Sequence, residues 1–299
     1  MGNNRCLPYI ENSEFMNTTR WLAPAKLNLF LHITKRRADG YHNLQTLFQF
    51  LDYCDILHFN VRHDGQISCQ SNAENLPPTQ DLVWRAATLL QQSSATHFGA
   101  DIRVEKKIPM GGGLGGGSSD AATTLLALNE LWQLHWPHEA LAQLGLTLGA
   151  DVPVFVYGHA AWAEGIGDEL TPRTLEEPWF LVIHPGCPVS TAKIFSDSDL
   201  TRDSIPIIMR DFLAGHCTNV CEPVVRRHYP QVGQALDWLN QFHPAHLTGT
   251  GACLFARVEN AVQANEILAK LPSQWDGFVA QGKNISPAIK SSQQHTITC

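Results

Sequence analysis

The chain has 299 residues, of which 44% are hydrophobic and 16% charged, and its formal net charge is −7. This length suffices for about two domains of ordinary size, and the composition excludes an intrinsically disordered chain. Affinity for nucleic acid rests on a basic face, so the negative charge argues against a nucleic-acid partner. No segment has the roughly 20 apolar residues that cross a membrane, so no membrane partner is expected.

The cysteines and histidines give no sign of a transition-metal site. The eight cysteines are scattered without a Cys-x-x-Cys pair, and the 14 histidines form no His-x-x-His or His-Glu-x-x-His set. This usage is typical of reduced thiols in a cytoplasmic protein. Residues 1–15 have no apolar core of signal-peptide length, and we expect a loose N-terminal extension there.

The spacing of apolar residues predicts strands and helices in the first half of the chain. Residues 21–34 alternate apolar and polar side chains from Lys26 onward, which is the periodicity of a strand. A second strand is expected over 44–61, and Pro77 and Pro78 mark a loop. In chain order, the pattern then predicts a helix over 82–94, a strand over 100–109, a glycine-rich loop followed by a helix, a helix over 137–149, and short strands and turns from 150 onward.

The second half is expected to form a smaller α+β unit. Residues 178–186 are an apolar run typical of a buried strand, and beyond about residue 190 helices alternate with short strands. We place a domain boundary near residue 166. The chain then divides into an N-terminal domain over 16–166, a C-terminal domain over 167–290 and a mobile polar tail over 291–299.

One segment, PMGGGLGGGSSDAATTLLALNELW (109–132), holds six glycines around a single leucine. Each glycine costs about 1 kcal/mol relative to alanine, so the bare backbone must serve a purpose. A strand, a glycine loop and a helix N-terminus together form an anion site, because the first amides of a helix are unpaired and its dipole is positive there. Ser118, Ser119 or Asp120 can cap this helix, and two lysines before the loop could add charge.

Three known kinds of phosphate loop compete for this segment. A P-loop closes with Gly-Lys-Ser or Gly-Lys-Thr, whereas this loop closes with Gly-Ser-Ser. Gly111, Gly113 and Gly116 match the dinucleotide pattern G-x-G-x-x-G. Glu130 has the spacing of the acidic residue in that pattern, but it lies inside the helical stretch. The glycine loop of protein kinases is followed by a strand lysine, which is absent here.

The loop and two further motifs resemble those of the GHMP kinases, the superfamily of galactokinase, homoserine kinase and mevalonate kinase. PAKLNLFLHI (24–33) is similar to the first motif of the superfamily, PMGGGLGGGSS (109–119) to its ATP loop, and LTGTGACLFA (247–256) to its third motif. The resemblance implies an α+β, two-domain GHMP kinase fold. The N-terminal ATP domain would be like ribosomal protein S5, and the C-terminal substrate domain would be ferredoxin-like.

Together with RADGYHNLQTLFQFLD (37–52) and GADVPVF (149–155), these motifs are similar to one branch of the superfamily. Its members phosphorylate the 2-hydroxyl of 4-diphosphocytidyl-2-C-methyl-D-erythritol in non-mevalonate isoprenoid biosynthesis. The resemblance covers about residues 22–288 and implies ATP, Mg²⁺ and that small-molecule substrate, in a monomer or a weak homodimer. Another alcohol, such as mevalonate or homoserine, and a non-catalytic nucleotide-binding module of the same fold are the alternatives.

Two residues are implied by the resemblance to be catalytic. Lys26 lies on the polar face of its strand, where a lysine is ordinarily solvated, and Asp151 follows a helix-ending Gly-Ala, where an aspartate is common in turns. The resemblance makes Asp151 the base for the reacting hydroxyl and Lys26 the cation that orients it and stabilises the hydroxyl as the proton leaves. A module that only binds ATP would need neither.

The resemblance implies that the remaining site residues bind ATP or the substrate. Those assigned to ATP are Lys106, Pro109, Met110, Gly111, Gly112, Gly113, Leu114, Gly115, Gly116, Gly117, Ser118 and Ser119. Those assigned to the substrate, with Tyr41 and Phe195 able to stack on a base, are Asn28, Tyr41, His42, Thr191, Phe195, Gly249 and Gly251.

Several assignments stay open on sequence. Ser118 or Ser119 could help to hold Mg²⁺, and Asp120 is either a helix cap or a metal ligand, so no metal ligand is firmly assigned. Lys35-Arg36-Arg37 is either a solvated turn or a site for the substrate's diphosphate. Asp81 departs from the asparagine usual in the family, and an aspartate cannot donate an amide hydrogen bond to adenine.

Overall fold

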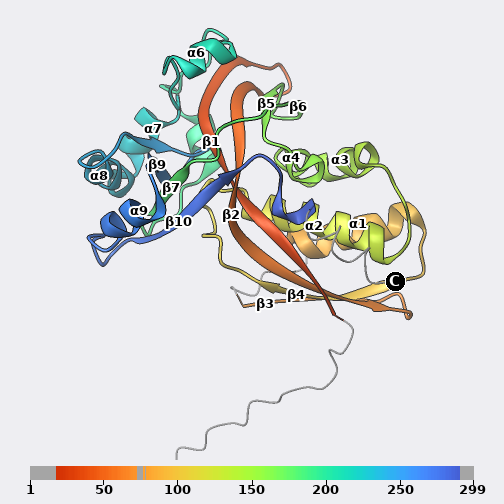
Figure 1. The fold of residues 1–299 in the computed structure, drawn as a ribbon. Helices are drawn as coiled ribbons and strands as arrows, with labels where there is room; N and C mark the ends of the chain where they lie inside the picture. The colour runs from red at the N-terminus through yellow and green to blue at the C-terminus, as the bar shows by residue number, and fades with distance from the viewer. Residues whose placement is uncertain (1–17, 73–76, 78, 290–299) are drawn as a thin grey trace, which may run out of the picture.

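Two long antiparallel strands, β1 (Thr19–Arg36) and β2 (His42–Arg62), cross the molecule and connect its two halves (Figure 1). The strands predicted in these two stretches are confirmed. Lys26, Asn28 and His32, which the alternation places on a polar face of β1, are all buried. That face therefore turns toward the interior of the protein and not toward solvent.

The computed structural model describes residues 18–72, 77 and 79–289. The extension expected over 1–15 and the tail expected over 291–299 lie outside these residues. Within the described part of the chain, no helix is both long and apolar enough to cross a membrane.

The strands form one mixed sheet whose path runs through β2. Its order is β3-β4-β2-β10-β7-β9-β8, with β1 and β5 also paired to β2, and β6 paired to β5. The strands that join β1 and β2 in this sheet are β3 (Ile67–Ser71), β4 (Gly99–Glu105), β5 (Ala161–Glu164), β6 (Glu169–Pro172), β7 (Trp179–His184), β8 (Ala245–Leu247), β9 (Leu254–Val258) and β10 (Asp276–Lys283). Because β10 pairs with both β2 and β7, it joins the sheet of the first half to that of the second.

The helices gather in two groups, on either side of the long strands (Figure 1). The first group is α1 (Leu82–Ser94), α2 (Gly116–Leu131), α3 (His138–Leu146) and α4 (Val152–Tyr157). The second group is α5 (Thr191–Ser196), α6 (Met209–Leu213), α7 (Glu222–His228), α8 (Pro230–Leu239) and α9 (Ala261–Leu268). Each group buries its own hydrophobic core, and Leu31 and Ile33 of β1 belong to the second one.

The helix predicted over 82–94 is present with those bounds, and the one predicted over 137–149 is present but ends at Leu146, whereas 150–158 is not a strand. Residues Val152–Tyr157 form the helix α4, which ends at Gly158 in the left-handed conformation. Five of its six residues are buried, so the helix has no exposed face that would require polar residues at regular spacing. A short, uniformly apolar run carries no periodicity that separates a strand from a helix, and Pro153 fits the first turn of a helix.

The domain boundary proposed near residue 166 lies in the turn between β5 and β6. These two strands pair with each other, and β5 also pairs with β2. The boundary therefore falls inside a hairpin of the first half, and it remains a prediction.

Candidate active site

A cavity of about 1060 Å³ lies where the two halves meet, and its walls come from both. Most of the residues expected from sequence to form the site line it: Lys26, Asn28, Tyr41, His42, Lys106, the continuous run Pro109–Ser118, Asp151, Thr191, Phe195 and Gly249. Ser119 is fully buried, and its hydroxyl has no hydrogen-bond partner among the described residues. Ser119 and Gly251 do not line the cavity.

The glycine loop depends on two glycines, whose backbone angles and close contacts would not tolerate a side chain. Gly113 has φ +76°, and a Cβ there would lie 2.3 Å from the carbonyl oxygen of Thr248. Gly115 has φ +72°, and a Cβ there would lie 2.8 Å from the ring of Phe155. Positive φ and close backbone approach are the two conditions that require glycine. The loop is therefore pressed between the second glycine motif on one side and the Phe155 helix on the other.

The second glycine motif backs the phosphate loop directly. The amides of Ala252 and Cys253 donate to the carbonyls of Gly111 and Gly112, at 3.2 and 3.0 Å. Asn219 in turn donates its amide to the carbonyl of Gly249 at 2.7 Å. These bonds fix the two loops to each other, although they are far apart in the chain.

Helix α2 presents its open N-terminus to the cavity. Its N-cap is Gly115, with no side-chain cap, and its first backbone bond runs from the Ser119 amide to the Gly115 carbonyl at 2.8 Å. The expectation that Ser118, Ser119 or Asp120 caps the helix is therefore wrong, because the helix begins earlier. The amides of the first turn stay without helical partners, and this arrangement suits a phosphate group.

Lys26 and Asp151 meet at the end of the glycine loop. Nζ of Lys26 lies 3.2 Å from Oδ2 of Asp151, donates to the carbonyl of Gly113 at 3.0 Å, and also donates to the side chain of Asn28. The Lys26 side chain is 4% exposed, whereas that of Asp151 is 35% exposed. The structure thus fixes the ammonium group in place and leaves the carboxylate accessible from the cavity.

Lys106 is held by two buried carboxylates. Its Nζ lies 2.6 Å from Asp120 and also bonds Asp55, which accepts the amide of Ile108 at 2.8 Å as well. Burial raises the pKa of Asp120. Burial alone would lower the pKa of Lys106, but the charges of Asp120 and Asp55 raise it. Lys106 therefore lines the cavity with its charge already paired, and Asp120 is one of its two ion-pair partners.

The far end of the cavity is lined by aromatic and hydroxyl side chains. The rings of His42 and Phe195 lie with centroids 5.2 Å apart, and Tyr41 beside them is 62% exposed. The hydroxyls of Thr191 and Thr250 share a hydrogen bond of 2.9 Å. The ring contact brings the start of β2 next to α5, and the hydroxyl bond brings α5 next to the second glycine motif.

Arg36 and Arg37 have different surroundings. Arg37 pairs with Asp39 at 2.9 Å, within the turn that joins β1 to β2. Arg36 lines the cavity and is the cross-strand partner of His42. Residues opposite each other on antiparallel strands project to the same face. Arg36 therefore lies on the same face as the residues at the far end of the cavity.

Several residues that shape the site were not found from sequence. Thr248 accepts the amide of Asn28 at 3.0 Å, and Asp55 and Asn219 hold the loops as described. Thr248 lies inside the quoted third motif, so its position was a usable signal. Asp55 and Asn219 are isolated polar residues with no local pattern, and only the tertiary structure reveals them. Asp81, the departure from the family, caps α1 by accepting the Val83 amide at 2.8 Å.

Two family models match the chain, "GHMP kinases N terminal domain" over residues 81–159 and "GHMP kinases C terminal" over residues 201–277. A 4-diphosphocytidyl-2-C-methyl-D-erythritol kinase of Nitrosococcus oceani is 58% identical over 266 residues, which are 89% of this chain and 95% of the relative. A kinase of the same name from Pseudomonas aeruginosa strain PAO1 is 57% identical over 264 residues, with coverages of 88% and 94%.

Solved structures agree with these sequence relatives. A 4-(cytidine 5'-diphospho)-2C-methyl-D-erythritol kinase superimposes with a TM-score of 0.77 at 31% identity, covering 88% of this chain and 99% of that one. A homoserine kinase from Cytophaga hutchinsonii superimposes with a TM-score of 0.65 at 16% identity, covering 91% and 97%. The second match is a likeness of fold alone.

Proposed function

Because this chain belongs to the GHMP kinases, and within them to the 4-diphosphocytidyl-2-C-methyl-D-erythritol kinases, we propose that it phosphorylates the substrate of that name at its 2-hydroxyl. The donor is ATP. The reaction forms a bond between the hydroxyl oxygen and the γ-phosphorus, breaks the bond from that phosphorus to the β-γ bridging oxygen, and releases ADP and the hydroxyl proton.

The single observation that carries this proposal is the Lys26–Asp151 pair at the end of the glycine loop. Phosphoryl transfer needs positioning and charge stabilisation, together with an acceptor for the hydroxyl proton. The accessible carboxylate of Asp151 is that acceptor, and the ammonium group of Lys26, fixed at 3.2 Å, stabilises the alkoxide as it forms. A module that only bound nucleotide would have no use for this pair.

The ATP phosphates lie on the glycine loop and the first turn of α2. The amides of Gly116, Gly117 and Ser118 face them, because the helix has no side-chain cap. The adenosine end would extend toward Asp81 and Lys106, which line the same cavity. The γ-phosphate would then lie next to Lys26, where the loop meets β1.

Mg²⁺ fits the chemistry of the phosphate end. Among the described residues no cluster of three or more histidine, cysteine or acidic side chains could hold a metal, and Mg²⁺ bound to nucleotides takes most of its ligands from phosphate and water. Ser118 lines the cavity at the start of α2 and would supply a protein oxygen as a ligand for the ion. When bound, the ion would neutralise charge on the transferred phosphate.

The substrate's cytidine end occupies the part of the cavity lined by Tyr41, His42 and Phe195. Stacking of a base on an aromatic ring contributes about 1–3 kcal/mol. Asn28, bonded to both Lys26 and Thr46, holds the reacting end of the substrate next to Asp151. The diphosphate lies between these two ends, on the side of Arg36.

Release of ADP tests the proposal. Purified protein is given ATP and, in separate reactions, 4-diphosphocytidyl-2-C-methyl-D-erythritol, mevalonate and homoserine. Turnover on the first alcohol alone supports the proposed function. Turnover on mevalonate or homoserine instead would assign the chain to another GHMP activity, and binding of ATP without turnover on any alcohol would make it a nucleotide-binding module.

A further inference from the structure

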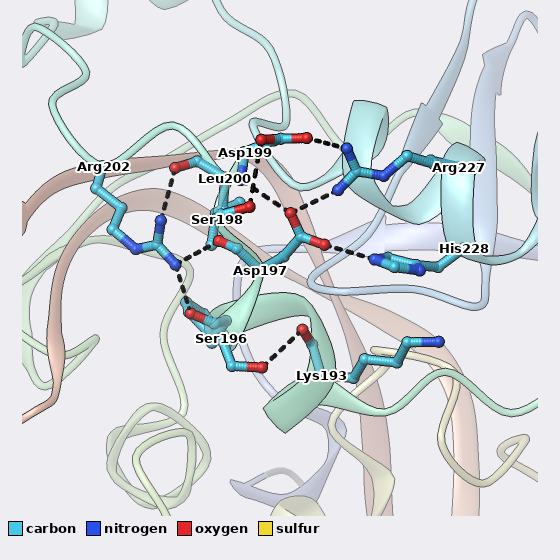
Figure 2. A network of polar contacts seen from close by, with 10 residues as sticks. Lys193, Ser196, Asp197, Ser198, Asp199, Leu200, Arg202, Arg227 and His228 are labelled. Carbon is cyan, nitrogen blue, oxygen red and sulfur yellow. Dashed lines mark hydrogen bonds and ion pairs between the residues drawn. The ribbon is translucent and has the colours of Figure 1, made fainter.

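Arg202 connects the two sides of the aromatic end of the cavity. Its Nε donates to Nε2 of His42 at 3.1 Å, and one Nη donates to the carbonyls of Phe195 and Asp197 at 2.8 and 2.7 Å. The other Nη donates to the carbonyl of Leu200 at 3.0 Å (Figure 2). No ion pair joins Arg202 to a carboxylate among the described residues. Four of its five N–H donors therefore hold these groups in place.

The segment that Arg202 grips is itself anchored from the other side. The carboxylate of Asp197 pairs with Arg227 at 2.6 Å and with His228, both at the end of α7 (Figure 2). Arg227 also pairs with Asp199. The bonds from Arg227 and His228 lower the pKa of Asp197. The chain that follows α5 is thereby fixed between Arg202 and α7, and Phe195 on α5 is held with it.

The contact with His42 has a chemical consequence. An arginine can only donate, so Nε2 of His42 must be the acceptor and cannot carry a proton. The ring proton then lies on Nδ1. Burial and the charges of Arg202 and Arg36 lower the pKa of His42, which agrees with a ring that carries one proton. Among the described residues Nδ1 has no hydrogen-bond partner, so its N–H is available to a ligand.

We propose that Arg202 is a positioning and specificity-determining residue for the nucleobase of the substrate. It holds His42 with the proton on Nδ1 and ties that ring to Phe195, so that the base-binding end is formed before the substrate arrives. The inference rests on the proposed function, because it assumes a cytidine-bearing substrate.

The proton position matters for the choice of base. Cytosine presents two neighbouring acceptors, N3 and O2, on its pairing edge, whereas uracil carries a proton on N3. An Nδ1–H donor matches the cytosine edge and conflicts with the uracil proton. A polar mismatch of this kind discriminates strongly, because it leaves a desolvated group unpaired.

The proton on His42 can be observed directly. In protein labelled with ¹⁵N-histidine, long-range ¹H–¹⁵N correlations report which ring nitrogen carries the proton, and the variant H42Q identifies the resonances of residue 42. We expect the Nδ1–H form in the wild-type protein and a shift toward the Nε2–H form in R202A. A wild-type His42 protonated on Nε2, or an unchanged spectrum in R202A, would overturn the proposal.

Kinetics separate positioning from general structural support. In R202A, the KM for the cytidine substrate should rise about tenfold, since the ordering of several side chains must then be completed on binding. The KM for ATP and the kcat at saturating substrate should stay within about threefold. R226A removes a guanidinium that links α7 to α8 and should change none of these. Equal losses in both KM values and in kcat in R202A would mean that Arg202 only stabilises the fold.

Two further measurements keep the result decisive. If R202A does not fold, R202K, which keeps the charge and three N–H donors on one nitrogen but cannot span four acceptors, should show a smaller rise in the same KM. Binding of CDP and UDP, followed by calorimetry, should favour CDP in the wild type and lose most of that preference in R202A; an unchanged preference would contradict the proposal. If the wild-type enzyme fails to phosphorylate the cytidine substrate, the proposed function falls, while the histidine spectra still decide the role of Arg202.

Discussion

Lys26 and Asp151 come from opposite ends of the first half of the chain and meet with Nζ 3.2 Å from Oδ2. Lys26 is carried by β1, which is fixed by the sheet, and Asp151 lies at the N-terminus of α4. Because the lysine is buried and bonded to Gly113 and Asn28, it cannot move away from Asp151 without losing these contacts. The geometry holds a cation where negative charge develops on the reacting oxygen.

Replacing Asp151 with asparagine should lower kcat about 10²- to 10⁴-fold, because the amide cannot accept the hydroxyl proton. The fold should be retained, since Asp151 caps no helix with its side chain. Steady-state kinetics and circular dichroism check both points. The control D64N alters a carboxylate of the exposed Arg62–Asp64 pair and should behave as wild type. Near-normal turnover in D151N would remove Asp151 from its role.

Replacing Lys26 with methionine keeps the length of the side chain and removes its charge. We expect kcat to fall about 10²- to 10³-fold, as for the loss of one preorganised donor to a developing oxyanion. The KM for the alcohol should change much less, since the contact strengthens only as the proton leaves. A large rise in KM with an unchanged kcat would instead show that Lys26 acts in binding alone.

Two glycines of the loop form a matched pair for testing close packing. G113A places a methyl group 2.3 Å from the carbonyl oxygen of Thr248, whereas G111A meets nothing within 4 Å, and both positions have positive φ. Backbone strain is therefore common to both variants, at about 1 kcal/mol. We expect G113A to raise the KM for ATP at least tenfold more than G111A. Equal effects would mean that the two glycine loops need not touch.

Arg36 and Arg37 form a second matched pair, one facing the cavity and the other occupied by Asp39. R36Q should raise the KM for the cytidine substrate severalfold, because the diphosphate loses an opposite charge. This increase in KM should be smaller at high salt, because salt screens the attraction between Arg36 and the diphosphate. R37Q should leave this KM unchanged. If R37Q has the larger effect, the diphosphate lies elsewhere.

Asp120 should give the fold a distinctive pH dependence. Burial raises its pKa, so between about pH 4 and neutrality the folded state binds a proton that the unfolded chain has released. The free energy of unfolding contributed by this group therefore increases as pH falls from 7.5 to 5.5. D120N removes the effect. Urea denaturation at both pH values should show wild type gaining stability relative to D120N, and parallel profiles would contradict this.

Sequence patterns were sufficient wherever several local signals agreed. The helix over 82–94 had clear periodicity and is present, although Asp81, which caps it, was considered on sequence only as a departure from the family's asparagine. The glycine loop was identified because six glycines between a strand and a helix have few explanations. The start of α2 was misplaced, because polar residues that are good caps lie inside the helix, where tertiary contacts such as that of Asp120 with Lys106 hold them.

The site itself was only half visible in the sequence. The alternation of apolar and polar residues predicts that Lys26 is exposed at the surface, because it does not say which face of a strand lines a cavity. Only the family resemblance places Lys26 in the site. Arg202 was not identified at all, because its four bonds join segments that no local pattern connects. Residues that support a site through tertiary contacts leave no periodic signal in a single sequence.

The most direct measurement is ³¹P NMR of the product formed from ATP and 4-diphosphocytidyl-2-C-methyl-D-erythritol. The account predicts one new phosphate monoester, coupled to the tertiary carbon that carries the 2-hydroxyl, in an amount equal to the ADP released. A phosphate on another hydroxyl, or ADP and free phosphate without a phosphorylated alcohol, would contradict it.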